Sequence, residues 1–487
     1  MPVSNFLNSG DIIRFLPEII LTIAATLLMV LDPIVNKRSS NLFGTLSIVA
    51  LIAALFGTVA AYGQAGTAFG GMLTIDGFAT FFRMLVIVVG ILTVLPSYEF
   101  LARQEAETSE YHALLLYSIA GQCLMASAND LIMIFIGLEI SSIASYVLAG
   151  YLRDDKRANE AALKYFLLGS FATGFFLYGV ALIYGATGTV NLSMARAAIT
   201  GATAPSPVFV GVAAALIFVG LGFKVSASPF QMWAPDVYQG APTPVTAFLS
   251  AGPKAAAFAV FLRIFMTAFE PIGNGWEPLV WISALLSMSI GNFAALLQSN
   301  VKRLLAYSSI AHAGYVLVAL TARSDVGTAA AMFYLAAYAL MNIGAFAVVS
   351  HLSGKGERYT NVEDLAGLGQ KQPLTAAMFA IFLLSLIGVP LTGGFFGKFY
   401  IFKAALESHL VWLTVLGLLN SAVAAYYYLR ILVMMYMYEP REATASAEPL
   451  SAGLGAALIL PAIGTLLLGI FPSWVLDFAG KSSNLLK

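Results

Sequence analysis

The stretch Ile134-Phe-Ile-Gly-Leu-Glu-Ile-Ser141 lies inside an apolar run over residues 130–152. A helix of about 20 apolar residues crosses the hydrocarbon core of a bilayer, because each residue adds about 1.5 Å. Glu139 lies about nine residues into this run, which places its carboxylate roughly 14 Å deep and close to the midplane. The run therefore predicts a transmembrane helix with an acidic group at a depth where lipid penalises charge.

The composition of the whole chain is that of a membrane protein. Hydrophobic residues make up 59% of its 487 residues and charged residues only 10%, whereas a soluble domain needs roughly a quarter charged residues. The net charge is zero, so nothing indicates a nucleic-acid partner or an anionic substrate. Cys123 is the only cysteine, which excludes an intrachain disulfide and a Cys-ligated iron–sulfur cluster on this chain. The four histidines are too scattered to match the spacing of metal ligands.

Thirteen further apolar runs resemble the one around Glu139, and polar or glycine-rich breaks separate them. The ten-residue alternation of β-barrel strands is absent, so we expect an all-α integral membrane protein with about 14 transmembrane helices. The runs cover residues 12–32, 42–62, 78–98, 111–128, 130–152, 160–185, 207–228, 243–269, 278–298, 302–321, 327–351, 374–404, 409–437 and 452–475.

Basic residues are distributed unequally between the two sets of loops. The loops after even-numbered spans carry only Arg196 and Arg323. The positive-inside rule therefore places the loops after odd-numbered spans in the cytoplasm and both termini on the periplasmic side. The loops after odd-numbered spans carry Lys37, Arg38, Arg103, Arg153, Lys156, Arg157, Lys302, Arg303, Lys355, Arg358, Lys371 and Arg441.

Four more titratable side chains lie deep within predicted spans: Lys224, Lys254, His312 and Lys398. A charge at the bilayer centre costs roughly 2.5–3.5 kcal/mol on insertion scales. Burial lowers the pKa of a lysine, and a nearby carboxylate raises it again. A row of such groups can take up and release protons near neutral pH, so together with Glu139 they predict a proton path. Any single one could instead be structural, since a buried Lys–Glu pair often pins helices together and a lone buried histidine is often a hydrogen-bonded core residue.

Two of the predicted spans contain helix breakers beside these lysines. The seventh ends in Ser226-Ala-Ser-Pro-Phe, and the twelfth contains Gly388-Val-Pro-Leu-Thr-Gly-Gly. Proline removes a backbone donor and glycine loosens a helix, so both segments are expected to unwind inside the protein. Discontinuous helices in matching positions of two halves indicate the ion path of a transporter. The alternative is a simple proline kink.

The spacing of the buried residues suggests an internal repeat. Glu139 and His312 are 173 residues apart, and Lys224 and Lys398 are 174 apart, while Lys254 has no charged counterpart. Two units of five helices each, an odd number, face in opposite directions and form an inverted repeat. We therefore expect an N-terminal three-helix segment (1–110), a first repeat (111–269), a second repeat (270–437) and a C-terminal helix (438–487).

Two motifs resemble a known family. Pro229-Phe-Gln-Met-Trp-Ala-Pro-Asp-Val-Tyr-Gln-Gly-Ala-Pro-Thr-Pro-Val-Thr-Ala-Phe-Leu-Ser250, followed by Pro253-Lys254, is similar to the seventh-to-eighth-span signature of subunit N of the proton-pumping NADH:quinone oxidoreductase, respiratory complex I. Gly393-Gly-Phe-Phe-Gly-Lys-Phe-Tyr400 resembles the twelfth-span signature of the same antiporter-like subunit. The resemblance extends from the fourth span to the fourteenth.

The resemblance implies a role for each buried residue. Glu139, Lys224, Lys254 and Lys398 match the proton-channel residues of the family, and His312 lies on the path between the half-channels.

The chain departs from the family pattern at two places. Gln231 stands where the family usually has histidine, which puts a proton role at that position in doubt. Leu391 replaces the second proline of the usual Gly-Ile-Pro-Pro, which leaves Pro390 to break the helix.

The resemblance also implies the biochemical setting. We expect a proton-translocating subunit with no redox centre of its own, in a bacterial inner membrane. We also expect Glu139 and Lys224 to interact, and a change in this interaction to couple the energy of the partner subunits to transport. Its partners would be neighbouring antiporter-like and small membrane subunits, and other subunits would hold FMN, the iron–sulfur clusters and the quinone. Two alternatives stay open: an Mrp-type cation/proton antiporter without redox partners, and a purely structural membrane subunit.

Overall fold

The computed structural model describes residues 9–33, 40–202, 204–445 and 449–483, which are almost entirely helical, as predicted. The first half contains α1 (Ser9–Arg14), α2 (Leu16–Leu31), α3 (Ser40–Tyr62), α4 (Gly77–Gln104), α5 (Ser109–Ser127), α6 (Leu131–Ala149), α7 (Lys156–Thr187), α8 (Leu192–Thr200), α9 (Pro207–Val225), α10 (Trp233–Gly240) and α11 (Thr243–Met266). The second half contains α12 (Gly273–Leu296), α13 (Val301–Thr321), α14 (Asp325–Leu352), α15 (Leu368–Lys371), α16 (Pro373–Ile387), α17 (Gly393–Glu407), α18 (Val411–Met437), α19 (Glu442–Ala445), α20 (Ala452–Ile470) and α21 (Ser473–Ser483). A short antiparallel hairpin, β1 (Gly66–Ala68) and β2 (Leu73–Ile75), joins α3 to α4.

Every range predicted to span the membrane contains a helix. Within the described residues, 11 helices are long and apolar enough to cross a membrane. The remaining three expected spans are α2, which has 16 residues, α5, and the pair α16 and α17, which divides the single run expected over 374–404. The count of 14 spans stays a prediction for these three.

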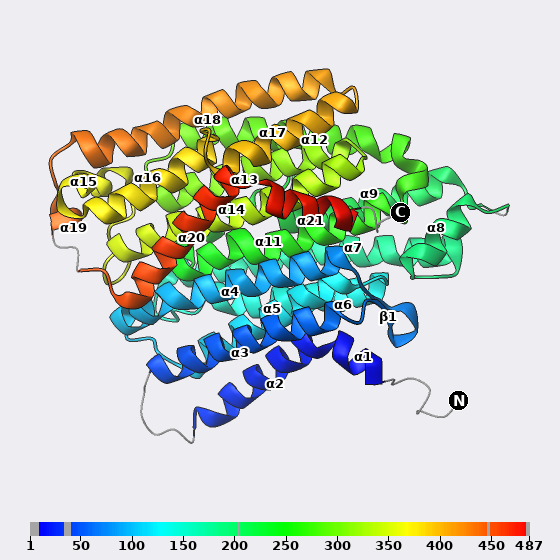
Figure 1. Cartoon of the computed structure of the whole chain (residues 1–487), viewed down its shortest axis with the longest axis horizontal. Coiled ribbons are helices and arrows are strands. Elements are labelled where there is room, and N and C mark those ends of the chain that lie inside the picture. The colour runs from blue at the N-terminus through cyan, green and yellow to red at the C-terminus, as the bar shows by residue number, and fades with distance from the viewer. Residues whose placement is uncertain (1–8, 34–39, 203, 446–448, 484–487) are drawn as a thin grey trace.

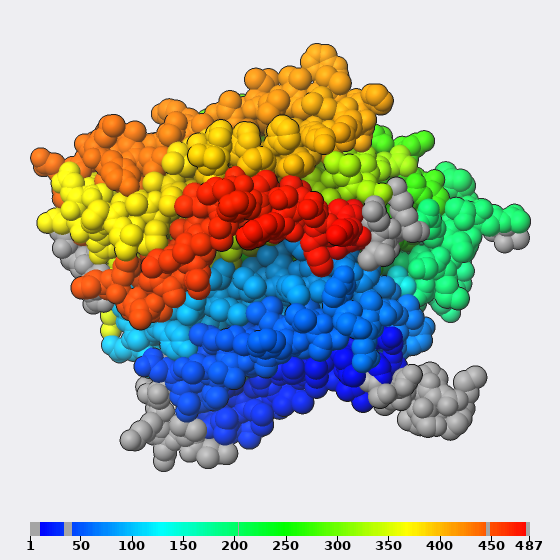
Figure 2. Space-filling model, viewed as in Figure 1, coloured from blue at the N-terminus to red at the C-terminus, as the bar shows by residue number. Residues whose placement is uncertain are grey.

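The long helices lie side by side and form one bundle (Figure 1). α2 and α3 lie at one edge of the bundle and α18 at the opposite edge, while α11, α13 and α14 are enclosed between them. Figure 2 shows α18 and the N-terminal helices as the two edges of one face, with α20 and α21 between them. The outer helices expose large apolar side chains, among them Phe56, Phe171 and Trp412, as a lipid-facing surface requires.

Both predicted helix breaks are present. α9 ends at Val225, and Ser226 has a left-handed backbone with φ of 59° before the short helix α10 begins. α16 ends at Ile387, where Gly388 has φ of 95°, a conformation that glycine adopts without a steric penalty. Leu391 has φ of 70°, which a proline ring cannot adopt because it fixes φ near −65°. The backbone conformation at Leu391 therefore explains why this chain lacks the second proline of the family pattern.

Two helix hairpins, α5–α6 and α12–α13, contain the same kinds of contact, and the residues that make them are 170 positions apart in the sequence. Isolated β-bridges join Asp130 to Asn191 before α6, and Asn300 to Asn361 before α13. Asp130 and Asn300 also cap the helices that follow them, since each side chain accepts a hydrogen bond from a backbone N–H in the first turn.

Close packing repeats at the same spacing. A Cβ atom on Gly121 would lie 2.6 Å from Gly137 O and 2.6 Å from Ser141 N. A Cβ atom on Gly291 would lie 2.7 Å from Tyr307 O and 2.6 Å from Ala311 N. These paired contacts support an internal repeat. Its inverted orientation and the four-segment division stay predictions.

The spacing of 170 residues also revises one expected correspondence. Glu139 lies nine residues after its capping residue Asp130, and Ser309 lies nine residues after Asn300. Ser309, not His312, therefore occupies the place of Glu139 in the second hairpin. His312 corresponds instead to Ser142.

Loops predicted to share one side of the membrane contact one another. Lys355 pairs with Glu105, and Arg157 donates to Gly356 O (3.0 Å), so the loops after α4, α6 and α14 meet at one end of the bundle. At the opposite end, Arg196 pairs with Glu270. Figure 1 places α15 and α19 at the first of these ends, and α1 and α8 at the other. The grouping agrees with the predicted sides. Lys37, Arg38 and both chain ends lie outside the described residues.

The sidedness is tested by cysteine labelling. Lys355 and Ser193 are both exposed. Lys355 pairs with Glu105 in the loop after α4, whereas Ser193 lies on α8, at the opposite end of the bundle (Figure 1). We expect Lys355→Cys to react with a membrane-impermeant maleimide only from the cytoplasmic side, and Ser193→Cys only from the periplasmic side, because positive charge favours the cytoplasmic loops. Labelling with the sides exchanged would contradict the orientation.

The close contact of α5 and α6 is tested by adding a methyl group. Gly121→Ala should lower the free energy of unfolding of the detergent-solubilised protein by about 1–3 kcal/mol. The new Cβ atom would overlap backbone atoms that cannot rotate away. Gly174→Ala on α7 is the matched control, since nothing lies within 4 Å of its Cβ position. Equal stability of the two variants would show that the α5–α6 contact is not tight.

Candidate functional site

Lys224 lies in the last turn of α9, directly before the first helix break. Its Nζ donates to Ser142 Oγ (2.6 Å) and Tyr146 OH (3.1 Å), both on α6. The same nitrogen lies over the rings of Tyr146 and Tyr165, 5.0 and 5.6 Å from their centroids. Hydroxyl oxygens and aromatic faces therefore hold this ammonium group.

Glu139 lies on α6, one turn before Ser142, and is half-buried. Its Oε1 atom is buried and has no hydrogen-bond partner. The sequence predicted an interaction between Glu139 and Lys224, but no ion pair within the described parts of the chain includes either residue. Ser142, one turn after Glu139 on α6, accepts a hydrogen bond from the Lys224 ammonium group instead.

Lys254 lies near the middle of α11 and is only 2% exposed. Its Nζ donates to the backbone oxygen of Ser309 on α13 (3.0 Å) and forms a short hydrogen bond with Ser309 Oγ. Tyr338 on α14 presents its ring 6.0 Å from the same nitrogen. Lys254 therefore contacts the residue that corresponds to Glu139 in the second hairpin.

His312 lies on α13, less than one turn beyond Ser309, and both ring nitrogens contact tyrosine hydroxyls. Nδ1 forms a hydrogen bond with Tyr334 OH on α14, and Nε2 lies 3.2 Å from Tyr428 OH on α18. A neutral imidazole has one N–H and one acceptor nitrogen, so one hydroxyl accepts while the other donates. Exchange of the two roles moves a proton across the ring.

Lys398 lies in the second turn of α17, after the second break, and its Nζ reaches back to the end of α16. It donates to Leu386 O (3.0 Å), Ile387 O (2.9 Å) and Ser421 Oγ (2.8 Å). The free carbonyl groups at the C-terminus of a helix carry partial negative charge and favour a cation there. The break in the twelfth span thus creates the binding site for this ammonium group. The Tyr315 ring lies 4.9 Å from Nζ.

The three lysines share one electrostatic property. They are 9%, 2% and 6% exposed, and their hydrogen bonds go to neutral oxygens, never to a carboxylate. Without a counter-ion, the charged form of a buried lysine is stabilised only by dipoles and aromatic faces. Such groups can lose and regain a proton without leaving an unpaired carboxylate behind.

Three other buried cations are paired with carboxylates, and the sequence did not single them out. Arg83 on α4 pairs with Glu18 on α2 (2.6 Å), and Arg263 on α11 pairs with Asp76 (3.0 Å). The third pair is Lys302 and Glu357 (2.9 Å). Glu357 also accepts hydrogen bonds from the backbone N–H and the hydroxyl of Thr243. The pair therefore connects the starts of α11 and α13 to the loop after α14. These pairs fit a structural role, since each keeps both charges compensated.

The hydroxyl partners of the lysines and of His312 are candidate site residues that sequence reasoning missed. Ser142, Ser309 and Ser421 each bond one buried lysine, while Tyr334 and Tyr428 bond His312. Serine and tyrosine occur throughout membrane helices, so composition gave no signal. The repeat spacing could have found Ser309, because it marks the counterpart of Glu139.

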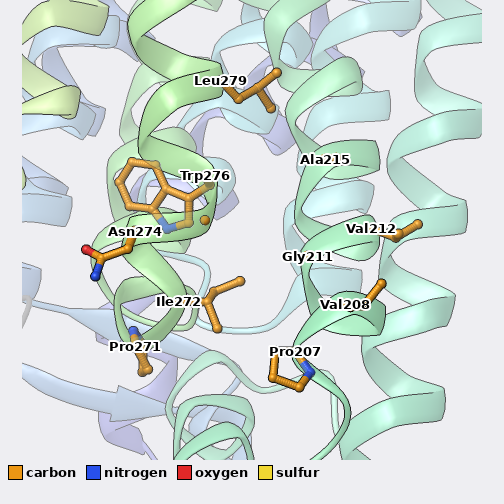
Figure 3. A pocket seen from close by; sticks show the side chains of 11 residues that line it. Pro207, Val208, Gly211, Val212, Ala215, Pro271, Ile272, Asn274, Trp276 and Leu279 are labelled. Carbon is orange, nitrogen blue, oxygen red and sulfur yellow. The ribbon is translucent and has the colours of Figure 1, made fainter.

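The described part of the chain holds no metal-binding cluster, and its groove between α9 and α12 lies away from the predicted site residues. Within the described segments, no group of three or more His, Cys, Asp or Glu side chains could hold a metal ion. A groove of about 600 Å³ between α9 and α12 is lined mainly by apolar residues such as Val208, Val212 and Trp276 (Figure 3). None of the five predicted site residues lines it.

A membrane bundle with two interrupted helices and a row of buried, unpaired lysines defines an antiporter-like membrane protein. The family model described as "NADH:quinone oxidoreductase/Mrp antiporter, TM" matches residues 128–424. NADH-quinone oxidoreductase subunit N 1 of Solibacter usitatus is 76% identical over 487 residues and covers 100% of both chains. The chain therefore belongs to the subunit N family of NADH-quinone oxidoreductase, as the sequence motifs predicted.

Chains of solved respiratory complexes share this fold. A chain of respiratory complex I from Thermus thermophilus with bound aureothin has 37% identity and a TM-score of 0.82, over 95% of this chain and 99% of that one. A chain of the membrane-bound sulfane sulfur reductase, an archaeal respiratory membrane complex, has 28% identity and a TM-score of 0.86, over 97% of both chains.

Proposed function

We propose that this chain is a proton-translocating membrane subunit of a bacterial NADH:quinone oxidoreductase. In this proposal, partner subunits hold FMN, the iron–sulfur clusters and the quinone, and they transfer electrons from NADH to quinone. The chain itself supplies a path for protons and no redox centre. It lies in the inner membrane beside other antiporter-like and small membrane subunits, with both termini on the periplasmic side.

The observation that carries the proposal is the set of three buried lysines without carboxylate partners. A buried structural lysine is stabilised by pairing, as Lys302 at the start of α13 is with Glu357. Lys224, Lys254 and Lys398 have only neutral partners, which leaves their protonation state free to change. This contrast argues against the purely structural alternative.

The position of Lys398 indicates the side of the membrane on which protons are released. Glu139 and Lys224 lie in the first half, Lys254 and His312 in the centre, and Lys398 in the second half beyond the break at Pro390. A cavity of about 470 Å³ beside Lys398 extends to Lys403 and Glu407 at the end of α17. The loop that follows α17 is predicted to be periplasmic, so Lys398 is placed to release protons on that side.

The energy for transport has to arrive from the partner subunits. Moving one charge against 100 mV requires about 2.3 kcal/mol. Breaking or making one buried interaction of a charged group is of this order. The Oε1 atom of Glu139 has no partner and lies one turn from the Ser142 hydroxyl that binds Lys224. A small movement of α6 relative to α9 would bring this carboxylate and Lys224 together or apart, and would so change their interaction.

The alternative of an Mrp-type antiporter shares the fold but has less support. The family model covers both classes of protein. The relatives that match along the full chain, with 76% and 51% identity, are named as subunit N of NADH-quinone oxidoreductase. Proton pumping coupled to NADH oxidation is therefore the activity to test.

The proposal is tested by replacing Lys398 with arginine. Arginine keeps the positive charge, but its pKa exceeds about 12, so it stays protonated. We expect Lys398→Arg to lower NADH-driven proton uptake into vesicles reconstituted with the whole complex on the order of tenfold, with normal assembly. Lys371→Arg is the control, because Lys371 is an exposed lysine that does not line the cavity beside Lys398. Wild-type uptake in Lys398→Arg would show that this lysine need not release its proton.

A further inference from the structure

The backbone of the first helix break is held by two serine side chains from the second half of the chain. The Ser228 N–H donates to Ser287 Oγ (2.8 Å), and the Ser283 hydroxyl donates to Ser228 O (2.6 Å). Both serines lie on α12, one turn apart, and the Ser287 hydroxyl donates to Ser283 O (2.6 Å). All three residues are at most 2% exposed. Buried backbone groups outside a helix need partners, so these hydroxyls replace the intrahelical bonds that the break removes.

The other end of the broken segment is also attached to the second half. After the break, α10 leads to Ala241, whose backbone oxygen accepts a hydrogen bond from Lys302 on α13 (2.6 Å). On α10 itself, Asp236 accepts from Arg303 on α13 (2.7 Å) and from Lys164 on α7 (2.8 Å). The backbone of the segment 226–241 is therefore bonded to α12 at one end and to α13 at the other.

Trp233, the first residue of α10, connects this segment to the Lys224 ammonium group. Its indole N–H donates to Phe223 O in the last turn of α9 (2.9 Å). Its ring stacks on Tyr165 and on Phe223, with centroids 4.5 and 5.3 Å apart. Those two rings lie 5.6 and 5.8 Å from Lys224 Nζ. Trp233 is 2% exposed and therefore fixes two of the aromatic rings around the ammonium group.

The second break is held within its own span. The Gly394 N–H donates to Ser385 Oγ (3.0 Å), which joins α17 to α16. Lys398 on α17 bonds the carbonyl groups at the end of α16, as described above. The first break instead depends on the hydroxyls of α12, so the position of α12 bears on the residues around this break and on Lys224 beside it.

We propose, on the basis of the function proposed above, that Ser283 and Ser287 are positioning residues for proton transfer at Lys224. The two hydroxyls hold the break, the break holds Trp233, and Trp233 holds the rings against the lysine. A cation–π contact weakens when the ring moves away from the cation. A shift of α12 relative to α9 therefore changes how well the charged form of Lys224 is stabilised. In this way the second half of the chain acts on the buried lysine of the first half.

The attachment is tested by hydrogen exchange in the intact complex. Ser287→Ala removes the acceptor of the Ser228 N–H. We expect the backbone amides of residues 226–232 to exchange about tenfold faster, because the loss of one hydrogen bond is worth about that factor. Mass spectrometry of peptic fragments measures the rate. Unchanged exchange in Ser287→Ala would overturn the proposal.

The matched control is Ser47→Ala. Ser47 on α3 is as buried as Ser287, and its hydroxyl donates to Phe43 O of its own helix (2.8 Å). This variant should keep the wild-type exchange rate in residues 226–232 and wild-type proton uptake, so a general effect of removing a buried hydroxyl would be recognised.

Transport is tested with Ser287→Ala and with Trp233→Phe, which keeps a ring but loses the indole N–H. In the whole complex, reconstituted in vesicles, we expect each variant to lower initial NADH-driven proton uptake about fivefold at normal assembly. Each loses one hydrogen bond between α12 and the rings around Lys224, and a hydrogen bond is worth about this factor. Combined with Lys224→Ala, neither should lower the remaining uptake further, because the group that they position is gone.

The outcomes separate this inference from the proposed function. Wild-type uptake in Ser287→Ala and Trp233→Phe, with uptake reduced in Lys398→Arg, would overturn the positioning role and leave the function standing. A further loss in the combinations with Lys224→Ala would also overturn the positioning role, since the two residues would then act on general packing. Wild-type uptake in both Lys224→Ala and Lys398→Arg would overturn both proposals.

Discussion

The structure depends on one constraint: an ammonium group inside a bilayer has to be stabilised without water. At the bilayer centre the cost is at least roughly 2.5–3.5 kcal/mol for each charge. The protein meets it in two ways. Arg83 and Arg263 pair with carboxylates and join helices. Lys224, Lys254 and Lys398 contact only hydroxyls, carbonyl groups and aromatic rings, so no carboxylate compensates their charge.

The interrupted helices are part of this solution. A continuous helix in the twelfth span would use the carbonyl groups of Leu386 and Ile387 for its own hydrogen bonds. The break at Gly388 frees them, and Lys398 on the next segment returns to bind them. The seventh span ends one residue after Lys224, and its ammonium group turns to the hydroxyls of α6 instead. Each break thus serves the lysine beside it.

Much of the fold could be predicted from the sequence, because lipid imposes simple rules on span length, loop charge and helix breakers. The five deep titratable residues followed from the same rules. The expected Glu139–Lys224 contact is absent, because the distance between two side chains on different helices depends on packing that hydropathy does not encode. The hydroxyl partners were also missed, since serine and tyrosine become conspicuous only when α12, α13 and α18 are brought together.

The most direct test of the central claim is proton uptake by vesicles that contain the complex with Lys254→Gln. Lys254 lies at the centre of the row, and glutamine keeps a polar group of similar length but cannot carry a proton. The account predicts normal assembly with NADH-driven proton uptake reduced on the order of tenfold. Wild-type uptake by the fully assembled variant would contradict it, because the buried lysine would then be no more than a structural residue.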